Sequence, residues 1–297
     1  MNIDISFVTI NFNSSAYTKE LINSIEKHTT LNYEIIIVDN DSQTVDSNAI
    51  KAFCKDKENI NFIQNSVNCG FSCGNMLGAK EANGKFILFI NNDTKLLNDV
   101  SKILVNALKS NQNTALATAE IVDKNNNIAS SYKLFPSLTK ELFGNTIARI
   151  FNKFPSNKAK LQTPSKVEVI SGSCMFFKRE IFLEVGGFDT HFFLYCEEED
   201  LSKRIINSGY NVMFIPDAKI YHEGGGSCSS NYNLIKEYYI SYTYLIFKHF
   251  NIITASLLYF LVITKLFRRS FTKKNGVKLF IDALKGFKEK DSMRYSQ

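Results

Sequence analysis

The chain has 297 residues, of which 44% are hydrophobic and 22% charged, and these proportions exclude a disordered or fibrous protein. The formal net charge of +6 belongs to the carboxyl-terminal part, because from Lys236 onward 12 lysines and arginines stand against 4 aspartates and glutamates. A basic tail on a slightly acidic body disfavours a nucleic-acid partner.

Strand patterns alternate with helical patterns over the first 122 residues. The chain enters the first strand pattern by Ile3 without a basic or cleavable apolar segment, so we expect no secretory signal and a cytoplasmic location. Strands are predicted at 5–11, 33–38, 60–64, 86–90 and 115–122, and helices at 14–28, 46–57 and 100–111, with a further helix ending near 82. Because this alternation forms right-handed βαβ units, we predict an α/β fold with a Rossmann-like, mostly parallel sheet flanked by helices.

The segment from Asn68 to Asn75 precedes the helix that ends near 82 and contains two glycines, Gly70 and Gly74, among small and polar residues. Glycines at a helix start let a ligand approach the backbone closely. The spacing matches neither a dinucleotide-binding fingerprint nor a P-loop.

The run Phe86–Ile90 is apolar and β-branched throughout, which is typical of a central strand buried on both faces. It ends abruptly at Asn91-Asn92-Asp93, and the carboxyl edge of such a sheet is where ligands bind. A carboxylate there, followed by Thr94, suits a divalent cation held against a phosphate. The alternative is that Asn-Asn-Asp forms only a turn.

Regularity is lost between residues 130 and 165, where three prolines and scattered aromatics occur. We expect this segment to be mobile and substrate-specific. Strand patterns resume at 167–170, 174–178 and 212–215, and a helix is predicted from about Glu198 to Gly209.

Four consecutive acids, Glu197 to Asp200, stand at the start of that helix. The helix macrodipole favours negative charge there, so a solvated acidic cap explains part of the pattern. The aromatic residues that precede it would desolvate at least one carboxylate, which raises its pKa and makes it a usable general base. His222 precedes three glycines and is either a metal ligand or a turn residue.

The tail, residues 234–297, contains two uncharged apolar stretches at 238–247 and 250–264, followed by six basic residues up to Lys278. Each stretch is shorter than the roughly 20 residues that a membrane-spanning helix needs. A basic, apolar helical pair suits peripheral contact with a membrane surface. The alternative is packing on the main domain or in a homodimer.

The six cysteines show no Cys-x-x-Cys spacing. We therefore expect reduced thiols, as is usual in a cytoplasmic protein, and no zinc site.

These motifs, taken in order over about residues 3–227, resemble a family 2 glycosyltransferase of the GT-A fold, and most of all its bacterial rhamnosyltransferase-like members. The segments that carry the resemblance are Val8–Asn13, Val38–Ser42, Asn68–Asn75, Phe89–Asp93, Ser171–Ser173, Gly186–Asp189, Glu197–Arg204 and His222. The resemblance places the glycosyltransferase domain at 1–233, with 130–165 as its variable acceptor-side segment.

The resemblance implies transfer of a sugar from a nucleoside diphosphate sugar to an acceptor hydroxyl, with inversion at the anomeric carbon. The donor would be bound by Thr9, Asn11, Asp39 and Asp41 around the nucleoside and by Asn68, Gly70, Phe71, Asn75 and Asn92 around the nucleotide and sugar. Asp93 is the remaining carboxylate of the family's Asp-x-Asp metal motif and His222 the second protein ligand, for Mg²⁺ or Mn²⁺. Asn91 departs from that motif, so the site has one carboxylate fewer and the resemblance implies a weaker affinity for the ion.

The family's acidic motif is usually Glu-Asp-x-Asp-Leu, whereas this chain has Glu197-Glu198-Glu199-Asp200-Leu201. The resemblance therefore implies that Glu198 is the catalytic base, with Asp200 as the second choice and Glu197 beside them. Glutamate is one methylene longer than the usual aspartate, and a placement error near 1 Å affects rate strongly.

The expected donor is a dTDP- or UDP-linked sugar, with rhamnose as the first guess. The expected acceptor is a cell-surface glycan or a lipid-linked oligosaccharide, met at the cytoplasmic face of the inner membrane. Two alternatives remain open: a non-catalytic nucleotide-sugar-binding scaffold, motivated by Asn91 and Glu198, and a sugar-1-phosphate nucleotidyltransferase. The second typically needs a glycine-rich, basic triphosphate loop after the first strand, and Asn11–Ser15 is not one.

Overall fold

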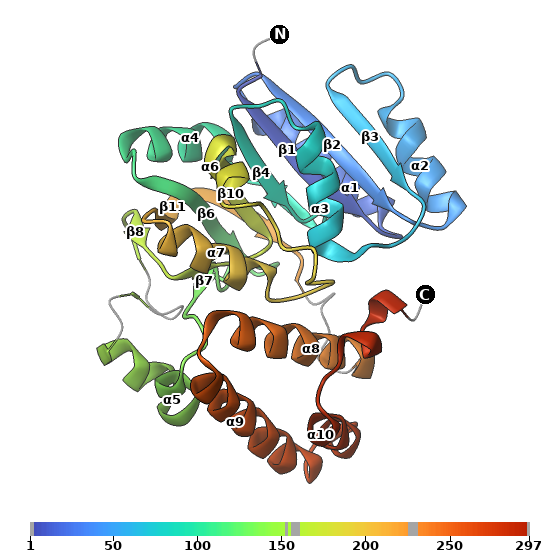
Figure 1. Cartoon of the computed structure of the whole chain (residues 1–297). Helices are drawn as coiled ribbons and strands as arrows, with labels where there is room; N and C mark the ends of the chain where they lie inside the picture. The colour runs from blue at the N-terminus through green and yellow to red at the C-terminus, as the bar shows by residue number, and fades with distance from the viewer. Residues whose placement is uncertain (1–2, 152–153, 156–160, 225–230, 296–297) are drawn as a thin grey trace.

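A nine-stranded sheet forms the centre of the protein (Figure 1), as seen in a computed structural model that describes residues 3–151, 154–155, 161–224 and 231–295. The strand order is β3-β2-β1-β4-β10-β6-β11-β5, with β8 paired to β11. The strands are β1 (Ile5–Asn11), β2 (Tyr33–Asn40), β3 (Ile60–Asn65), β4 (Phe86–Ile90), β5 (Thr94–Leu96), β6 (Thr114–Val122), β8 (Ser165–Lys166), β10 (Cys174–Lys178) and β11 (Asn211–His222). The β3-β2-β1-β4 half is wholly parallel, which confirms the predicted βαβ units.

Helices cover both faces of the sheet. They are α1 (Ser15–His28), α2 (Thr44–Cys54), α3 (Gly70–Glu81), α4 (Val100–Ser110), α6 (Arg179–Glu184) and α7 (Glu197–Asn207). One core lies between the sheet and α1, α2 and α4, and a second lies between the sheet and α3, α6 and α7. In β1, Phe7 belongs to the first core and Val8 to the second. Alternate side chains of one strand thus enter opposite cores, which is why these strands are apolar without interruption.

The strand β5 is separated from β4 by only three residues in the chain but does not pair with it. β5 pairs antiparallel with β11 at the sheet's edge, and the register places His222 opposite Thr94. His222 was expected after a strand ending at 215, but β11 continues to His222 past a register shift between Ile215 and Lys219. Pro216 lies within this irregularity, where its lack of a backbone N–H removes no ladder hydrogen bond.

The segment 130–165 is more regular than the sequence predicts. It contains β7 (Tyr132–Lys133), which pairs with β9 (Val169–Ile170), and the helix α5 (Leu138–Phe151), kinked at Gly144. Ser137 precedes the helix and its hydroxyl accepts from the backbone N–H of Lys140. The prolines that suggested irregular structure stand outside this helix, so they bound it rather than break it.

The tail folds into three helices, α8 (Tyr232–His249), α9 (Ile252–Ser270) and α10 (Gly276–Lys285), whereas the sequence predicts two. Figure 1 shows them on the side of the molecule away from β1–β3, with α8 between the sheet-containing part and α9. A third core joins them to Phe135, Val169 and Phe192 of the main domain. The sequence left open whether the tail packs on the main domain, and α8 does so. In the described part of the chain, none of the helices combines the length and the apolar character needed to cross a membrane.

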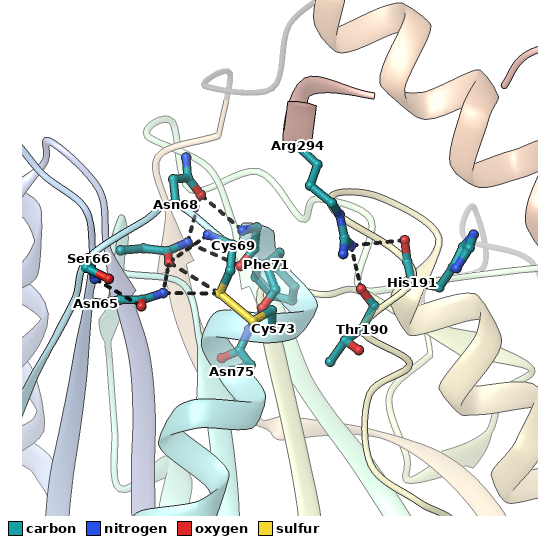
Figure 2. The surroundings of a disulfide bond; sticks show 12 residues. Asn65, Ser66, Asn68, Cys69, Phe71, Cys73, Asn75, Thr190, His191 and Arg294 are labelled. Carbon is teal, nitrogen blue, oxygen red and sulfur yellow. Dashed lines mark hydrogen bonds between the residues drawn. A yellow bond between two sulfur atoms is a disulfide. The ribbon is translucent and has the colours of Figure 1, made fainter. Parts of the chain in front are cut away.

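The expectation of reduced thiols is wrong at one pair, because Cys69 and Cys73 form a disulfide, shown in Figure 2. Cys69 is the residue before α3 and Cys73 lies in its first turn, so their Cα atoms are 5.5 Å apart, a distance a disulfide can bridge. A search for Cys-x-x-Cys spacing misses such a pair. Cys54, Cys174 and Cys196 are buried free thiols, and Cys228 lies outside the described residues.

Candidate active site

A cleft of about 400 Å³ opens at the carboxyl ends of β1 and β4. Four of the predicted site residues line it: Phe71, Asn75, Asn92 and Asp93. It is also lined by residues that the sequence did not single out for binding, namely Ile10, Phe12, Ser14, Tyr17, Ile90 and Leu194. Two larger hollows, of about 730 and 620 Å³, lie elsewhere and contain none of the predicted site residues. The cleft at the strand ends is therefore the candidate donor site.

A polar network joins the ends of β1 and β2 beside this cleft. The amide of Asn11 donates to Asp39 Oδ1 at 2.8 Å and to Asp46 Oδ1 at 2.8 Å, and its oxygen accepts from Thr18 at 2.8 Å. Burial acts to raise the pKa of Asp46, but hydrogen bonds from Asn11 and Ser15 hold it below its usual value. The predicted pair of Asn11 and Asp39 is thus brought together, and Asp46 is an addition from the first turn of α2.

Two other predicted nucleoside-binding residues lie differently. Thr9 is almost fully buried, and within the described residues its hydroxyl has no hydrogen-bond partner. Asp41 is exposed at the turn after β2, with a positive φ of 66°. Of the two, Asp41 is the one that solvent can reach.

Hydrogen bonds of asparagine side chains fix the turn at the start of α3. The amide of Asn40 donates to Asn68 Oδ1 at 2.9 Å, and the same oxygen accepts from Gly70 N at 3.0 Å. Asn65 donates to the sulfur of Cys69, as Figure 2 shows. The disulfide and these hydrogen bonds together fix the turn that presents Phe71 and Asn75 to the cleft.

Gly70 and Gly74, the two glycines of the segment Asn68–Asn75, serve packing within the chain rather than the approach of a ligand. A Cβ added at Gly70, which has a φ of +84°, would lie 2.2 Å from Phe193 O, and one added at Gly74 would lie 2.8 Å from Ile10 Cδ1. Gly70 thus lets the backbone of the 186–196 loop touch α3, where Phe71 N donates to Phe193 O at 2.7 Å. Gly74 lets α3 lie close against β1.

Asp93 and His222 lie together although 129 positions separate them in the chain. The pairing of β5 with β11 brings His222 Nε2 to 3.2 Å from Asp93 Oδ1, and both side chains are about one quarter exposed. A carboxylate oxygen and an imidazole nitrogen are a set that a divalent cation accepts. Within the described ranges, no group of three or more His, Cys, Asp or Glu residues is arranged so that it could hold a metal ion. These two residues could hold a cation whose other positions stay open to phosphate oxygens and water.

The acidic helix α7 begins after two residues in the left-handed conformation, Tyr195 at φ 72° and Cys196 at φ 67°. Such a conformation costs roughly 1–2 kcal/mol per non-glycine residue and is concentrated at functional sites. The turn places the carboxyl group of Glu198 over Gly172, where an added Cβ would lie 3.7 Å from Glu198 Cδ. Ser173 of the same loop accepts from the backbone N–H of Asn91 at 3.1 Å. Glu198 therefore lies next to the loop that adjoins the end of β4.

The four acids of α7 differ in their surroundings. Burial and the charge of Glu198 raise the pKa of Glu197 well above its usual value and that of Glu199 to about 7. Burial also acts to raise the pKa of Glu198, but Lys133 holds it below its usual value. The side chain of Glu198 is 14% exposed, against 9% for Glu199 and 0% for Asp200. Glu198 is thus the carboxylate of this group that is both ionised and accessible.

Asp200 is occupied on both of its oxygens. Oδ2 accepts from Arg204 at 2.7 Å, and Oδ1 accepts from Lys248 at 2.6 Å and lies 2.8 Å from His249 Nε2. Burial acts to raise its pKa, yet His249, Arg204 and Lys248 lower it to about 2. Arg204 also donates to Val185 O and Gly187 O. Asp200 therefore joins α7, the loop before it and the end of α8.

Three residues of this region were missed by sequence reasoning: Lys133, Lys248 and His249. Lys133 is 65 positions from Glu198, and His249 is 49 positions from Asp200. Such pairs leave no local pattern. The only sequence signal was indirect, because an unbroken row of four acids needs cations from somewhere else in the fold.

A sequence model of the family described as "Glycosyl transferase family 2" matches residues 6–186, and one described as "N-terminal domain of galactosyltransferase" matches residues 152–223. The chain is 25% identical over 217 residues to the rhamnosyltransferase WbbL of Escherichia coli K12, covering 69% of this chain and 78% of that protein. It is 31% identical over 107 residues to the N-acetylglucosaminyl-diphospho-decaprenol L-rhamnosyltransferase of Mycobacterium tuberculosis H37Rv. That match covers 34% of this chain and 35% of the mycobacterial protein.

A solved structure of similar fold is the mannosyltransferase PcManGT of Pyrobaculum calidifontis in complex with GDP-Man and Mn²⁺. The TM-score is 0.60 at 12% identity, with 96% of this chain and 80% of that chain covered. At this identity the likeness shows the fold alone, and the fold is GT-A, as the sequence predicts. Since the family model covers more than half of the chain, the protein belongs to glycosyltransferase family 2.

Proposed function

We propose that the protein is an inverting, metal-dependent glycosyltransferase that moves a sugar from a nucleoside diphosphate sugar to a hydroxyl of a glycan or lipid-linked acceptor. The observation that carries the proposal is the Asp93–His222 pair beside the cleft at the ends of β1 and β4. Rhamnose from a dTDP-linked donor is the first candidate, supported by the names of two relatives at 25% and 31% identity.

Asp93 and His222 would hold Mn²⁺ or Mg²⁺, which supplies positive charge against the diphosphate leaving group. The imidazole is a softer ligand than a carboxylate, and this favours Mn²⁺ over the harder Mg²⁺. The nucleoside would lie against the Asn11–Asp39 network, with the donor sugar between Phe71, Asn75 and Asn92.

Glu198 takes the proton of the acceptor hydroxyl while that oxygen forms a bond to the anomeric carbon. The bond from this carbon to the diphosphate oxygen breaks on the opposite side, so the configuration inverts, and no enzyme nucleophile is needed. Its lowered pKa keeps Glu198 ionised at neutral pH, and its exposure lets the acceptor reach it. Asp200 has no such access, because it is fully buried among three cationic or imidazole groups.

Sugar transfer by the Asp93→Ala variant tests this assignment. Loss of the carboxylate should lower kcat/KM by about 10³-fold, since a bound metal contributes several kcal/mol to the transition state. Asp217→Ala is the matched control, because Asp217 is exposed on β11, the strand that also carries His222. Wild-type transfer by Asp93→Ala at saturating Mn²⁺ would remove Asp93 from the mechanism. Neither transfer nor donor hydrolysis by the wild-type protein with any donor would favour the scaffold alternative.

The tail would dock on an anionic membrane surface and so reach a lipid-linked acceptor at the cytoplasmic face of the inner membrane. Four exposed apolar residues lie along α9 at helical spacing, and a fifth directly follows the helix: Ile253, Leu257, Phe260, Phe267 and Phe271. Around them the exposed charges are basic, at Lys265, Arg268, Lys273 and Lys274. An apolar stripe bordered by cations is complementary to anionic lipid.

The double variant Ile253→Ser, Phe260→Ser tests this surface. It should bind vesicles that contain anionic lipid about tenfold or more weakly than the wild type, because each change removes exposed apolar area available for insertion. Val45→Ser on α2 is the control, since Val45 is 84% exposed but far from the stripe in the chain. Unchanged vesicle binding together with lost self-association would assign the stripe to a homodimer contact instead.

A further inference from the structure

One cation from outside the family's motifs lies against the acidic cluster. Lys133 Nζ is 2.9 Å from Glu198 Oε1 and 2.5 Å from Glu199 Oε1. It belongs to the short strand β7, which the pairing with β9 holds next to the 171–173 loop. From this geometry, and resting on the function proposed above, we infer that Lys133 is a positioning residue that orients the carboxylate of Glu198 and keeps it ionised for proton abstraction.

Among the described residues, Lys133 is the cation that binds Glu198 directly. The other charged and titratable groups around the cluster are Glu197 and Glu199 on α7, Cys196 before it, Lys140 and Glu141 on α5, Glu168, and Tyr238 and Tyr242 on α8. Lys140 is occupied elsewhere, because its ammonium donates to Leu134 O at 2.7 Å. Burial also lowers the pKa of Lys140, whereas the charges of Glu198 and Glu199 outweigh burial at Lys133 and raise its pKa.

The inferred role follows from the crowding of carboxyl groups at the start of α7. Three consecutive glutamates lie in a largely desolvated turn, and like charges at this spacing oppose ionisation of the group as a whole. Lys133 bridges two of them, so that one negative charge can persist on Glu198 while the pKa of Glu199 is raised to about 7. Without the lysine, the site would have to protonate both glutamates or expose them to water. The base would then be neutral at a pH where catalysis requires its ionised form.

Lys133 also restricts where Glu198 can point. The ion pair holds Oε1 on the β7 side of the carboxyl group, and Gly172 leaves room for that group over the 171–173 loop. A glutamate is one methylene longer than the aspartate usual at this position, so its carboxylate has more conformations to lose. A fixed partner on β7 reduces that freedom before the acceptor binds.

The test compares Lys133→Met, Lys133→Arg and Lys140→Met. The pH dependence of kcat/KM should show an acid limb set by Glu198, and this limb should move to higher pH by about 1 to 3 units in Lys133→Met. Lys133→Arg should restore most of the wild-type profile, because it keeps the charge. Lys140→Met, which removes a neighbouring lysine that does not bind Glu198, should leave the limb where it is.

A second measurement does not depend on turnover. Carboxyl ¹³C titration of glutamate-labelled protein, assigned with Glu198→Gln, should show a higher pKa for Glu198 in Lys133→Met than in the wild type. Wild-type turnover with an unmoved acid limb and an unmoved carboxyl titration in Lys133→Met would overturn this inference alone. An absence of turnover by the wild type with every donor tested would overturn the proposed function, and the role of Lys133 with it.

Discussion

The donor side and the acidic side of the site are built in different ways. On the donor side, polar residues follow directly on the strands that carry them: Asn11 ends β1, Asp39 lies near the end of β2, and Asp93 follows β4. On the acidic side, Glu198 and Asp200 depend on Lys133, Lys248 and His249, which come from β7 and the tail. The strand arrangement alone brings the donor-side residues together, because the carboxyl ends of parallel strands meet at one edge of the sheet. The acidic side forms only when β7 and the end of α8 have packed against α7.

This difference predicts that neighbouring carboxylates of α7 respond oppositely to substitution. Glu198→Gln should lower kcat by about 10²- to 10⁴-fold, the usual contribution of a general base. The free energy of unfolding should change by less than about 1 kcal/mol, because Lys133 keeps its ion pair with Glu199. Single-turnover transfer and urea unfolding measure the two effects. A stable variant with wild-type turnover would remove Glu198 as the base.

Asp200→Asn should show the converse effect. It removes the charge that pairs with Arg204 and Lys248 in a fully buried position, and this should cost about 3–5 kcal/mol of unfolding free energy. The pKa of Asp200 in the folded protein, about 2, lies below its usual value, so its contribution to stability is present above about pH 4 and is lost as the pH falls toward 2. Urea midpoints measured across that range should fall less steeply in the variant. A stability equal to that of the wild type at pH 7 would contradict the anchoring role.

The disulfide on the donor side gives a smaller expected effect. Cys73→Ser opens a ring of five residues, which should lower the free energy of unfolding by about 2 kcal/mol at most. Mass spectrometry of the native protein under non-reducing conditions monitors the bond in each preparation. Cys54→Ser is a control, because that thiol is buried without a disulfide. Equal destabilisation by reductant in the wild type and in Cys73→Ser would show that the bond does not contribute.

The parts of the fold that the sequence predicts are those with a local cause. The apolar runs of β1, β2 and β4 indicate a sheet covered on both faces, and the polar residues after them indicate its ligand edge. Asp93 and His222 were paired through the family resemblance, and the antiparallel pairing of β5 with β11 supplies the physical reason they meet.

The parts that sequence patterns misjudge have causes elsewhere in the chain. The sequence suggests that Gly74 lets a ligand approach the backbone, whereas in the structure the side chain of Ile10 fills the space that a Cβ at this position would need. The prolines near α5 led to a prediction of irregular structure, although a helix begins two residues after Pro136. Lys248 and His249 separate the two apolar stretches of the tail in the sequence, and in the structure they bind Asp200. In each case the meaning of the residue is set by a partner that no spacing rule identifies.

The proposed function depends most on a divalent cation that Asp93 and His222 hold against a nucleoside diphosphate sugar in the cleft. The most direct test is the melting temperature of wild type and His222→Ala with dTDP-, UDP- and GDP-sugars, each with and without Mn²⁺, because a ligand of the folded state must raise it. We expect one nucleotide sugar to raise the melting temperature of the wild type only with Mn²⁺, and His222→Ala to lose most of this shift. The same shift in both proteins, or none with any donor, would contradict this expectation.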